Sequence, residues 1–333
     1  MSETISPNVP IDFRFYLLPN FSMLAFSAAI EALSLANRVL GYNAYEWRAI
    51  SREGGPVRAS CGFDIQTSGD LLSERKQQLD RIPSATIFIC ADKNVDEYTD
   101  KSLAAWLREC KMRGLRIGAL GTGTYILALA GLLENKHCTI HWERLPSFVE
   151  QFSAAKPNHG IYEVDGQIVT CAGGMASFDM IINIIEQDFG ERIAAQICEI
   201  AIVERVRTGD ERQRIPLLQR HGIKNATVIA AIDIMENSLT DPISTEEIAS
   251  RLKRSRRQVE RLFRHEIKRS PIQYYRELRV ERAKQLLSHC GLPIVEIAIS
   301  CGFVSASHFS RCYRKVYGMS PQEARNSPNS SVW

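Results

Sequence analysis

The sequence has no apolar run long enough to cross a membrane. A transmembrane helix needs about 20 consecutive, mostly apolar residues. The longest apolar stretches, residues 126–133 and 193–202, are short and contain Gly131, Gln196 and Glu199. The first residues, MSETISPNVPIDFRF, contain no basic segment followed by an apolar one, which a secretory signal requires. We therefore expect a cytoplasmic protein with no membrane partner.

Cysteine pairs at metal-binding or redox spacing are also absent. The nine cysteines are an odd number, show no CxxC spacing, and in several cases (Cys90, Cys171, Cys198) lie within apolar stretches. Such a distribution is typical of reduced cytosolic thiols rather than a disulfide framework. We expect no metal site and no cofactor.

Basic and acidic residues are unevenly distributed. The 333 residues carry a net charge of +3, but residues 1–210 hold 20 Lys and Arg against 26 Asp and Glu, whereas residues 211–333 hold 21 against 12. A basic third favours a nucleic-acid-binding module, with a solvated basic face as the alternative. The length suits two domains, and 45% hydrophobic with 24% charged residues is ordinary for a globular protein.

The basic third is predicted to be helical. Apolar residues recur at helical spacing over 226–236, Asp241-Pro242 interrupts the chain, and Ser244 with Glu247 forms a capping box before a short helix over 245–252. A second helix starts after Ser255 and has two distinct faces. Its inward face carries Val259, Leu262, Phe263 and Ile267, and its outward face carries Arg256, Arg257, Glu260, Arg261 and Arg264.

This pair of helices occurs twice. Ile248-Ala249 matches Ile297-Ala298 at an offset of 49 residues, and Ser270-Pro271 matches Ser320-Pro321 at an offset of 50. The inward positions of the second helix match Phe309, Cys312, Tyr313 and Tyr317. Two helix-turn-helix units joined by a helix over 271–288 suit successive major grooves, which lie about 34 Å apart on one side of DNA. A helical bundle with a merely solvated basic face is the alternative.

The repeat resembles the DNA-binding domain of the AraC/XylS transcription regulators. The resemblance rests on SRRQVERLFR at 255–264, CGFVSASHFSRCYRK at 301–315 and GMSP at 318–321. It implies that bases of double-stranded promoter DNA are contacted by Arg257, Glu260, Arg261, Ala306, Ser307, Ser310 and Arg311. The chemistry agrees, because Arg pairs with guanine, Glu accepts from cytosine and a methyl group contacts thymine. We interpret five further basic residues as phosphate contacts: Arg256, Arg264, Lys268, Arg314 and Lys315.

The acidic part alternates predicted strands and helices. Strands are expected over 11–18, 46–51, 86–90 and 116–120, and helices over 22–37 and 100–113. This alternation predicts an α/β domain with a parallel sheet and helices on both faces. Ligands of such sheets bind beyond the carboxyl ends of the strands. A further helix over 190–207 is expected to pack on this domain or on a second subunit.

One strand end has the pattern of a nucleophile elbow. The strand over 116–120 runs into GTGT at 121–124 and a helix over 125–130. The region resembles class I glutamine amidotransferases of the PfpI type, which have a flavodoxin-like fold with Cys at the elbow and His nearby. Here Gly121 occupies the elbow, the nearest thiols, Cys110 and Cys138, lie on other elements, and His141 has no nucleophile to serve. We expect no catalytic residue; an active amidase-like or deglycase-like hydrolase fused to a DNA-binding module is the alternative.

Together the two parts are similar to the GlxA family of regulators. The similarity is carried by NFS at 20–22, IEAL at 30–33, His141-Trp142, AGGM at 172–175 and QRIP at 213–216. It implies an effector-sensing domain over 10–207, a linker over 208–224 and a DNA-binding domain over 225–326. Most members are activators, and the effectors are small amines or amino-acid-like compounds such as betaine, carnitine or arginine. We expect a homodimer and RNA polymerase as further partners.

The effector pocket is expected at the elbow. Helix N–H groups over 122–124 suit a carboxylate, and the Trp142 ring suits an ammonium group. Glu31 is a candidate partner for the cation, with a surface position as the alternative, and His141-Trp142 has ordinary strand-end packing as its alternative. The full set comprises Phe21, Glu31, Gly121, Thr122, His141, Trp142 and Met175.

Overall fold

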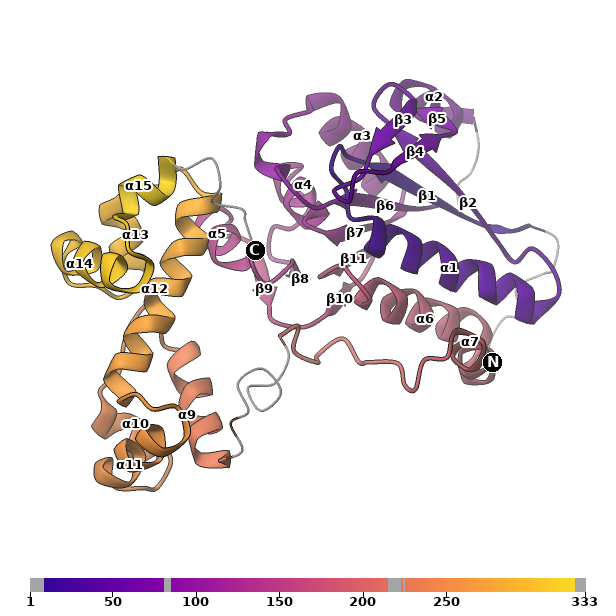
Figure 1. The fold of residues 1–333 in the computed structure, drawn as a ribbon. Helices are drawn as coiled ribbons and strands as arrows, with labels where there is room; N and C mark the ends of the chain where they lie inside the picture. The colour runs from indigo at the N-terminus through magenta and orange to yellow at the C-terminus, as the bar shows by residue number, and fades with distance from the viewer. Residues whose placement is uncertain (1–8, 81–84, 215–222, 224, 327–333) are drawn as a thin grey trace. The chain divides into compact units, whose positions relative to one another are not determined.

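The chain folds into two compact units. The computed structural model describes residues 9–80, 85–214, 223 and 225–326 (Figure 1). The first unit comprises Met1–Gln213 and the second Arg214–Trp333. Residues 215–222 and 224 of the predicted linker lie outside the described residues.

A seven-stranded sheet forms the centre of the first unit. Its strand order is β10-β11-β7-β6-β1-β2-β5, and its neighbours are parallel except β10 and β11. The strands are β1 (Ile11–Leu17), β2 (Tyr45–Ser51), β5 (Gly69–Asp70), β6 (Thr86–Ala91), β7 (Arg116–Gly121), β10 (Tyr162–Asp165) and β11 (Ile168–Cys171). Two small sheets pair β3 (Gly55–Arg58) with β4 (Asp64–Thr67), and β8 (His137–Thr139) with β9 (Lys156–Asn158).

Helices cover both faces of this sheet. Because side chains alternate along a strand, Phe15 of β1 lies in one core and Tyr16 in the other. The first core is covered by α1 (Met23–Leu40), α6 (Ala176–Phe189) and α7 (Glu191–Ala201), and the second by α3 (Lys101–Met112), α4 (Gly123–Leu129) and α5 (Leu145–Gln151). Also present are α2 (Leu71–Asp80) and η1 (Val95–Glu97). The predicted α/β class is confirmed.

Helix α1 is long and apolar enough to cross a membrane by length and composition alone. In this structure it covers the sheet instead. Ala29, Ala32 and Leu33 have no exposed surface, and the helix packs against α6 and α7. Ser22 caps its first turn, and Gly41, with φ of 79°, ends it. These features describe a core helix of the α/β unit.

The helix predicted over 190–207 is shorter in the structure. Helix α7 ends at Ala201, and Ile202 takes a left-handed φ of 56°. The Val203 N–H donates to the Cys198 carbonyl, which closes the helix end. The chain then continues without helix to Arg207, which binds the buried Asp179 of α6. The boundary differs because tertiary hydrogen bonds replace the helical ones.

The described residues of the second unit form helices only. They are α9 (Ala226–Glu236), α10 (Thr245–Arg251), α11 (Arg256–Glu266), α12 (Pro271–His289), α13 (Ile294–Ser300), α14 (Ala306–Tyr317) and α15 (Pro321–Asn326). Helix α12 runs through both halves, with α10 and α11 at one end and α13 and α14 at the other (Figure 1). Its 19 residues span about 28 Å.

Each half of the second unit has its own core. Tyr274, Tyr275 and Leu278 of α12 pack with α9, α10 and α11. Val280 and the residues after it pack with α13 and α14. The predicted repeat is therefore a structural one, because matched positions such as Phe263 and Tyr313 fill equivalent places in the two cores.

Candidate DNA-binding surface and effector site

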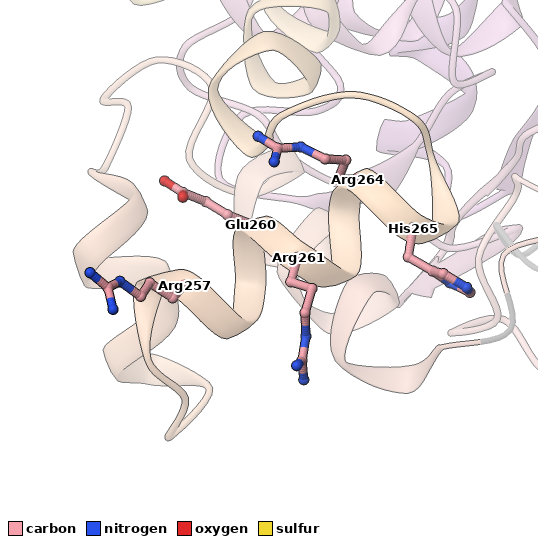
Figure 2. A pocket seen from close by; sticks show the side chains of 5 residues that line it. All are labelled: Arg257, Glu260, Arg261, Arg264 and His265. Atoms are coloured by element: carbon pink, nitrogen blue, oxygen red, sulfur yellow. The ribbon is translucent and has the colours of Figure 1, made fainter.

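Helix α11 presents a basic outer face. A capping box of Ser255 and Gln258 starts the helix, and Val259 and Phe263 anchor its inner face with at most 1% exposure. Its outward side chains line an open hollow of about 350 Å³ (Figure 2). The lining residues are Arg257, Glu260, Arg261, Arg264 and His265. Four of them are predicted DNA contacts, and His265 is an addition that the sequence analysis did not include.

Acidic side chains hold one of the predicted phosphate contacts. Arg256 donates to Glu260 at 2.7 Å and also pairs with Glu246 of α10. Both carboxylates raise the pKa of Arg256, with Glu260 contributing most. Among the described residues, no such partner is found for Arg257 or Arg261, so their guanidinium groups are available to a nucleic acid.

Lys268 lies just beyond the end of α11. Its ammonium group donates to the His265 carbonyl at 2.9 Å and so caps the helix. Its backbone is left-handed, with φ of 61°. The side chain is exposed, so this local contact leaves the predicted phosphate role untested.

Helix α14 repeats this arrangement in the other half. Ser305 caps its first turn, and Phe309, Cys312 and Tyr313 are buried. The predicted contacts lie at exposed or partly exposed positions: Ala306, Ser307, Ser310, Arg311, Arg314 and Lys315. His308 is a further residue on this helix. Burial and then the charges of Arg276, Arg311 and Arg279 lower the pKa of His308, which favours a neutral ring at neutral pH.

The elbow of the α/β unit is closed by backbone. Gly121 ends β7 with φ of 66°, a conformation that favours glycine. A Cβ atom there would lie 2.7 Å from the Ala91 carbonyl oxygen, and Gly173 approaches from the other side. The elbow therefore has no nucleophile. A side chain at this position would also require the neighbouring backbone to shift.

Internal hydrogen bonds occupy part of the predicted carboxylate site. The Thr122 N–H donates to the Ala91 carbonyl at 3.3 Å, and its hydroxyl donates to the Asp92 carbonyl at 2.8 Å. Thr122 is only 3% exposed. The expectation that the Thr122 N–H is available to a carboxylate is therefore wrong for this structure, because the neighbouring strand end already accepts that hydrogen bond.

His141 and Trp142 follow β8 of the small β8-β9 sheet, and Asp92, whose carbonyl binds Thr122, acts electrostatically on His141. Their rings lie 5.7 Å apart, and the His141 Nδ1 is 3.7 Å from a Glu143 carboxylate oxygen. Both residues are partly exposed. Burial lowers the pKa of His141, while Glu143 and Asp92 oppose that shift. The site thus offers a neutral imidazole, an indole and a nearby carboxylate to a small molecule.

The other predicted pocket residues are scattered. Phe21 has no exposed surface and packs against Phe26. Glu31 is exposed and lies about 12 Å along α1 from its first residue, whereas Ala25 of the first turn is the α1 residue near Gly173. Met175 is 47% exposed and lies two residues after Gly173. Phe21 is thus buried and Glu31 exposed on α1, and their place in the effector pocket stays a prediction.

Buried thiols near the strand ends are poor nucleophiles. Cys90 lies near the end of β6 and Cys171 at the end of β11, and both are at most 1% exposed. Burial raises the pKa of the Cys171 thiol to about 12 and that of Cys138 likewise to about 12. Burial also raises the pKa of Cys90. Because the thiolate is the reactive form, these cysteines are protonated at neutral pH.

The segment of residues 208–213, which the sequence analysis assigns to the linker, packs on the first unit. The Gly209 carbonyl accepts from the Ile161 N–H, and Gly209 lies against Tyr162. We call residues 208–213 the strap. Its last residue, Gln213, donates from Nε2 to the Thr139 hydroxyl and to the Ile140 and Gly160 carbonyls, each at 2.9 Å.

The strap therefore ends beside the candidate effector site. Ile140 directly precedes His141, and the Thr139 carbonyl accepts from the Thr124 hydroxyl of α4 at 2.8 Å. At the other end, buried Asp179 accepts from the Arg207 backbone and guanidinium. Neither Gln213 nor Asp179 was predicted as functional. For Gln213, the only sequence feature that pointed to this position was the QRIP segment at residues 213–216, which is similar to the GlxA family.

Known proteins identify the class of this chain. Residues 248–327 match the helix-turn-helix domain family. The crystal structure of an AraC family transcriptional regulator from Pseudomonas putida is 21% identical, with a TM-score of 0.52, over 58% of this chain and all of that chain. A ThiJ/PfpI family protein from Pseudomonas syringae is 16% identical, with a TM-score of 0.50, over 59% of this chain and 76% of that chain. The chain thus combines a PfpI-like α/β domain with a helix-turn-helix domain.

Two full-length relatives identify the family. The HTH-type transcriptional regulator CdhR of Pseudomonas aeruginosa is 36% identical over 94% of this chain and 91% of its own length. The HTH-type transcriptional regulator GlxA of Rhizobium meliloti is 32% identical over 95% and 96%. The chain therefore belongs to the AraC-type transcriptional regulators related to GlxA, which confirms the predicted family.

Proposed function

We propose that this protein is a transcription regulator whose α/β unit binds a small metabolite without converting it. The observation that carries the proposal is a glycine-occupied elbow beside a strap. The strap binds Thr139 and Ile140, next to the elbow helix, and leads into the DNA-binding unit. Gly121 has no reactive group, and the nearby thiols have raised pKa values. A bound metabolite would leave unchanged, which suits a sensor.

The exposed side chains around His141 favour an amine or amino-acid-like effector, such as betaine, carnitine or arginine. The Trp142 indole supplies a face for an ammonium or quaternary ammonium group. Glu143 supplies a negative charge 3.7 Å from the His141 ring. Met175 is a further candidate on the wall because it is exposed and follows Gly173, which lies against the elbow.

The strap is the route by which the effector acts in this proposal. A ligand that moves His141 also moves Ile140 and Thr139, which hold Gln213. Residue 214 begins the DNA-binding unit. A docked strap therefore restricts the movement of that unit, and a released strap lets it move more freely. The ligand shifts this equilibrium only as far as its affinities for the two arrangements differ.

The DNA target is double-stranded promoter DNA read by α11 and α14. In this proposal the bases are contacted by outward residues of both helices: Arg257, Glu260, Arg261, Ala306, Ser307, Ser310 and Arg311. Phosphates are bound by Arg256, Arg264, Lys268, Arg314 and Lys315. The recognition helices lie at the two ends of α12, whose length of about 28 Å is close to the roughly 34 Å between successive major grooves. We further propose a cytoplasmic homodimer that activates transcription together with RNA polymerase.

A ligand panel tests the sensor role. Thermal unfolding of the full chain is followed with amino acids, betaines and carnitine, because a ligand of the folded state raises the midpoint in a saturable manner. Trp142→Ala should abolish the shift, and Trp47→Phe, a partly buried aromatic packed against the core on β2, serves as the control. A saturable shift that survives Trp142→Ala would place the ligand elsewhere, and the formation of a hydrolysis product would establish an enzyme.

A further inference from the structure

The two halves of the DNA-binding unit touch outside their shared helix α12. Gly302 lies in the turn between α13 and α14 and has φ of 74°. A Cβ atom at Gly302 would lie 2.5 Å from Pro242 Cγ and 2.7 Å from the Leu239 carbonyl oxygen. Pro242 and Leu239 belong to the loop between α9 and α10, in the other half. Glycine is therefore required both by the backbone conformation and by this close approach.

Arg279 joins the two halves at the middle of α12. Leu278 is the last α12 residue in the first core and Val280 is the first in the second, so Arg279 lies at the boundary between the cores. Its NH1 donates to the Gly302 carbonyl at 2.8 Å. Its guanidinium carbon lies 4.5 Å from the Phe303 ring centroid and 5.7 Å from that of Tyr275.

Tyr275 completes the connection. Its hydroxyl donates to the Ser238 carbonyl at 2.6 Å, at the end of the first half's α9. A continuous series of contacts thus runs from Ser238 through Tyr275 and Arg279 to Gly302. We call these four residues the junction. Partial burial lowers the pKa of the Arg279 guanidinium, and the two aromatic rings stabilise the cation there.

We propose that Arg279 is a positioning residue that sets the spacing between the two DNA sequences read by α11 and α14. Without the junction the two cores would be joined through a single helix, which bends and twists more easily than two connected elements. A second connection fixes both the separation and the rotation of the recognition helices. This inference rests on the proposed reading of DNA by both helices.

The arginine side chain suits this role. Its planar guanidinium stacks on aromatic rings while its fixed N–H groups donate to a carbonyl, which a lysine ammonium does not reproduce. Arg279→Lys keeps the charge and the aliphatic stem, and removes the planar stack and the directed donor. Tyr275→Phe is a milder second variant, because it keeps the ring and removes only the hydroxyl, with its hydrogen bonds to Ser238 and to the Ile243 backbone.

The test measures spacing tolerance. Sequences bound by the full chain are selected from a random DNA library, and probes are then made with one base pair inserted between the two recognised blocks. One base pair moves a block by about 3.4 Å along the duplex and rotates it by about 34°. We expect insertion to weaken wild-type binding by at least about fivefold, the cost of a typical single mismatch.

Arg279→Lys should reduce that insertion penalty to less than half of the wild-type ratio, and Tyr275→Phe should reduce it to a smaller extent. Arg75→Lys, which changes a surface pair with Glu109 in the α/β unit, is the matched control and should keep the full penalty. A purely structural role for Arg279 lowers affinity for both probes equally, and an unchanged ratio in both variants would overturn the proposal. Selection of a single recognised block by the wild type would instead refute DNA reading by both helices.

Discussion

Gln213 offers the most direct perturbation of the strap. Replacing it with alanine removes an amide nitrogen that contacts three oxygens, each at 2.9 Å, on Thr139, Ile140 and Gly160. The amide has two hydrogens, so at most two full hydrogen bonds are lost. Each contributes about 0.5–1.5 kcal/mol net, and we expect the strap to open more easily by about 1–3 kcal/mol. This corresponds to roughly a 5- to 150-fold increase in the open population.

Trypsin reports this opening at Arg212, which lies within the strap and directly precedes Gln213. Cleavage tracks the open population when opening and closing are fast relative to cleavage. The cleavage rate after Arg212, followed by mass spectrometry, should therefore rise by the same factor in Gln213→Ala. Gln187→Ala is the control, since Gln187 is exposed on α6 and contacts only Asn183 among the described residues. Unchanged cleavage, or an equal rise at sites throughout the chain, would refute the argument.

Three further changes test separate parts of the account. Arg261→Ala should cost about 1–3 kcal/mol of DNA affinity and relax preference at one base position, whereas an equal loss for all sequences in a binding titration would make Arg261 a phosphate contact. Gly121→Cys should destabilise the chain by about 1–3 kcal/mol in urea unfolding, because its Cβ meets the Ala91 carbonyl, and hydrolysis by this variant would show that the remaining machinery is intact. In the folded protein Cys61, which is exposed, should react with a thiol reagent at pH 8, while Cys171, with a pKa raised to about 12, should stay unmodified; its reaction there at the rate of Cys61 would contradict the burial argument.

Sequence patterns predicted the elements of both units well where the physics is local. Helical spacing of Val259 and Phe263 and the cap at Ser244 located the first helix-turn-helix. The structure has the Ser244 cap, and the capping box at Ser255 was not predicted. The internal repeat then located the second. The alternation of strands and helices likewise indicated a parallel sheet. A strand buried on both faces is mostly apolar, and residues 87–90 (IFIC) fit that pattern.

The site was harder to predict because it depends on contacts between distant residues. Glu31 belongs to the IEAL motif at residues 30–33, yet in the structure it lies about 12 Å along α1 from the first residue of that helix, and Ala25 of the first turn is the residue near Gly173. Thr122 lies at the elbow, but its N–H is used by Ala91 of the neighbouring strand. Gln213 lies 73 residues from Ile140, so no local pattern could reveal their hydrogen bond.

The central claim is that a ligand of the α/β unit controls DNA binding by the helix-turn-helix unit. The most direct measurement is the affinity of the full chain for its selected DNA, with and without a saturating ligand identified by thermal unfolding. Coupling between two sites is typically about 5- to 150-fold. We expect a change of this size, which should shrink in Gln213→Ala. Equal affinity with and without a ligand that demonstrably binds would contradict the account.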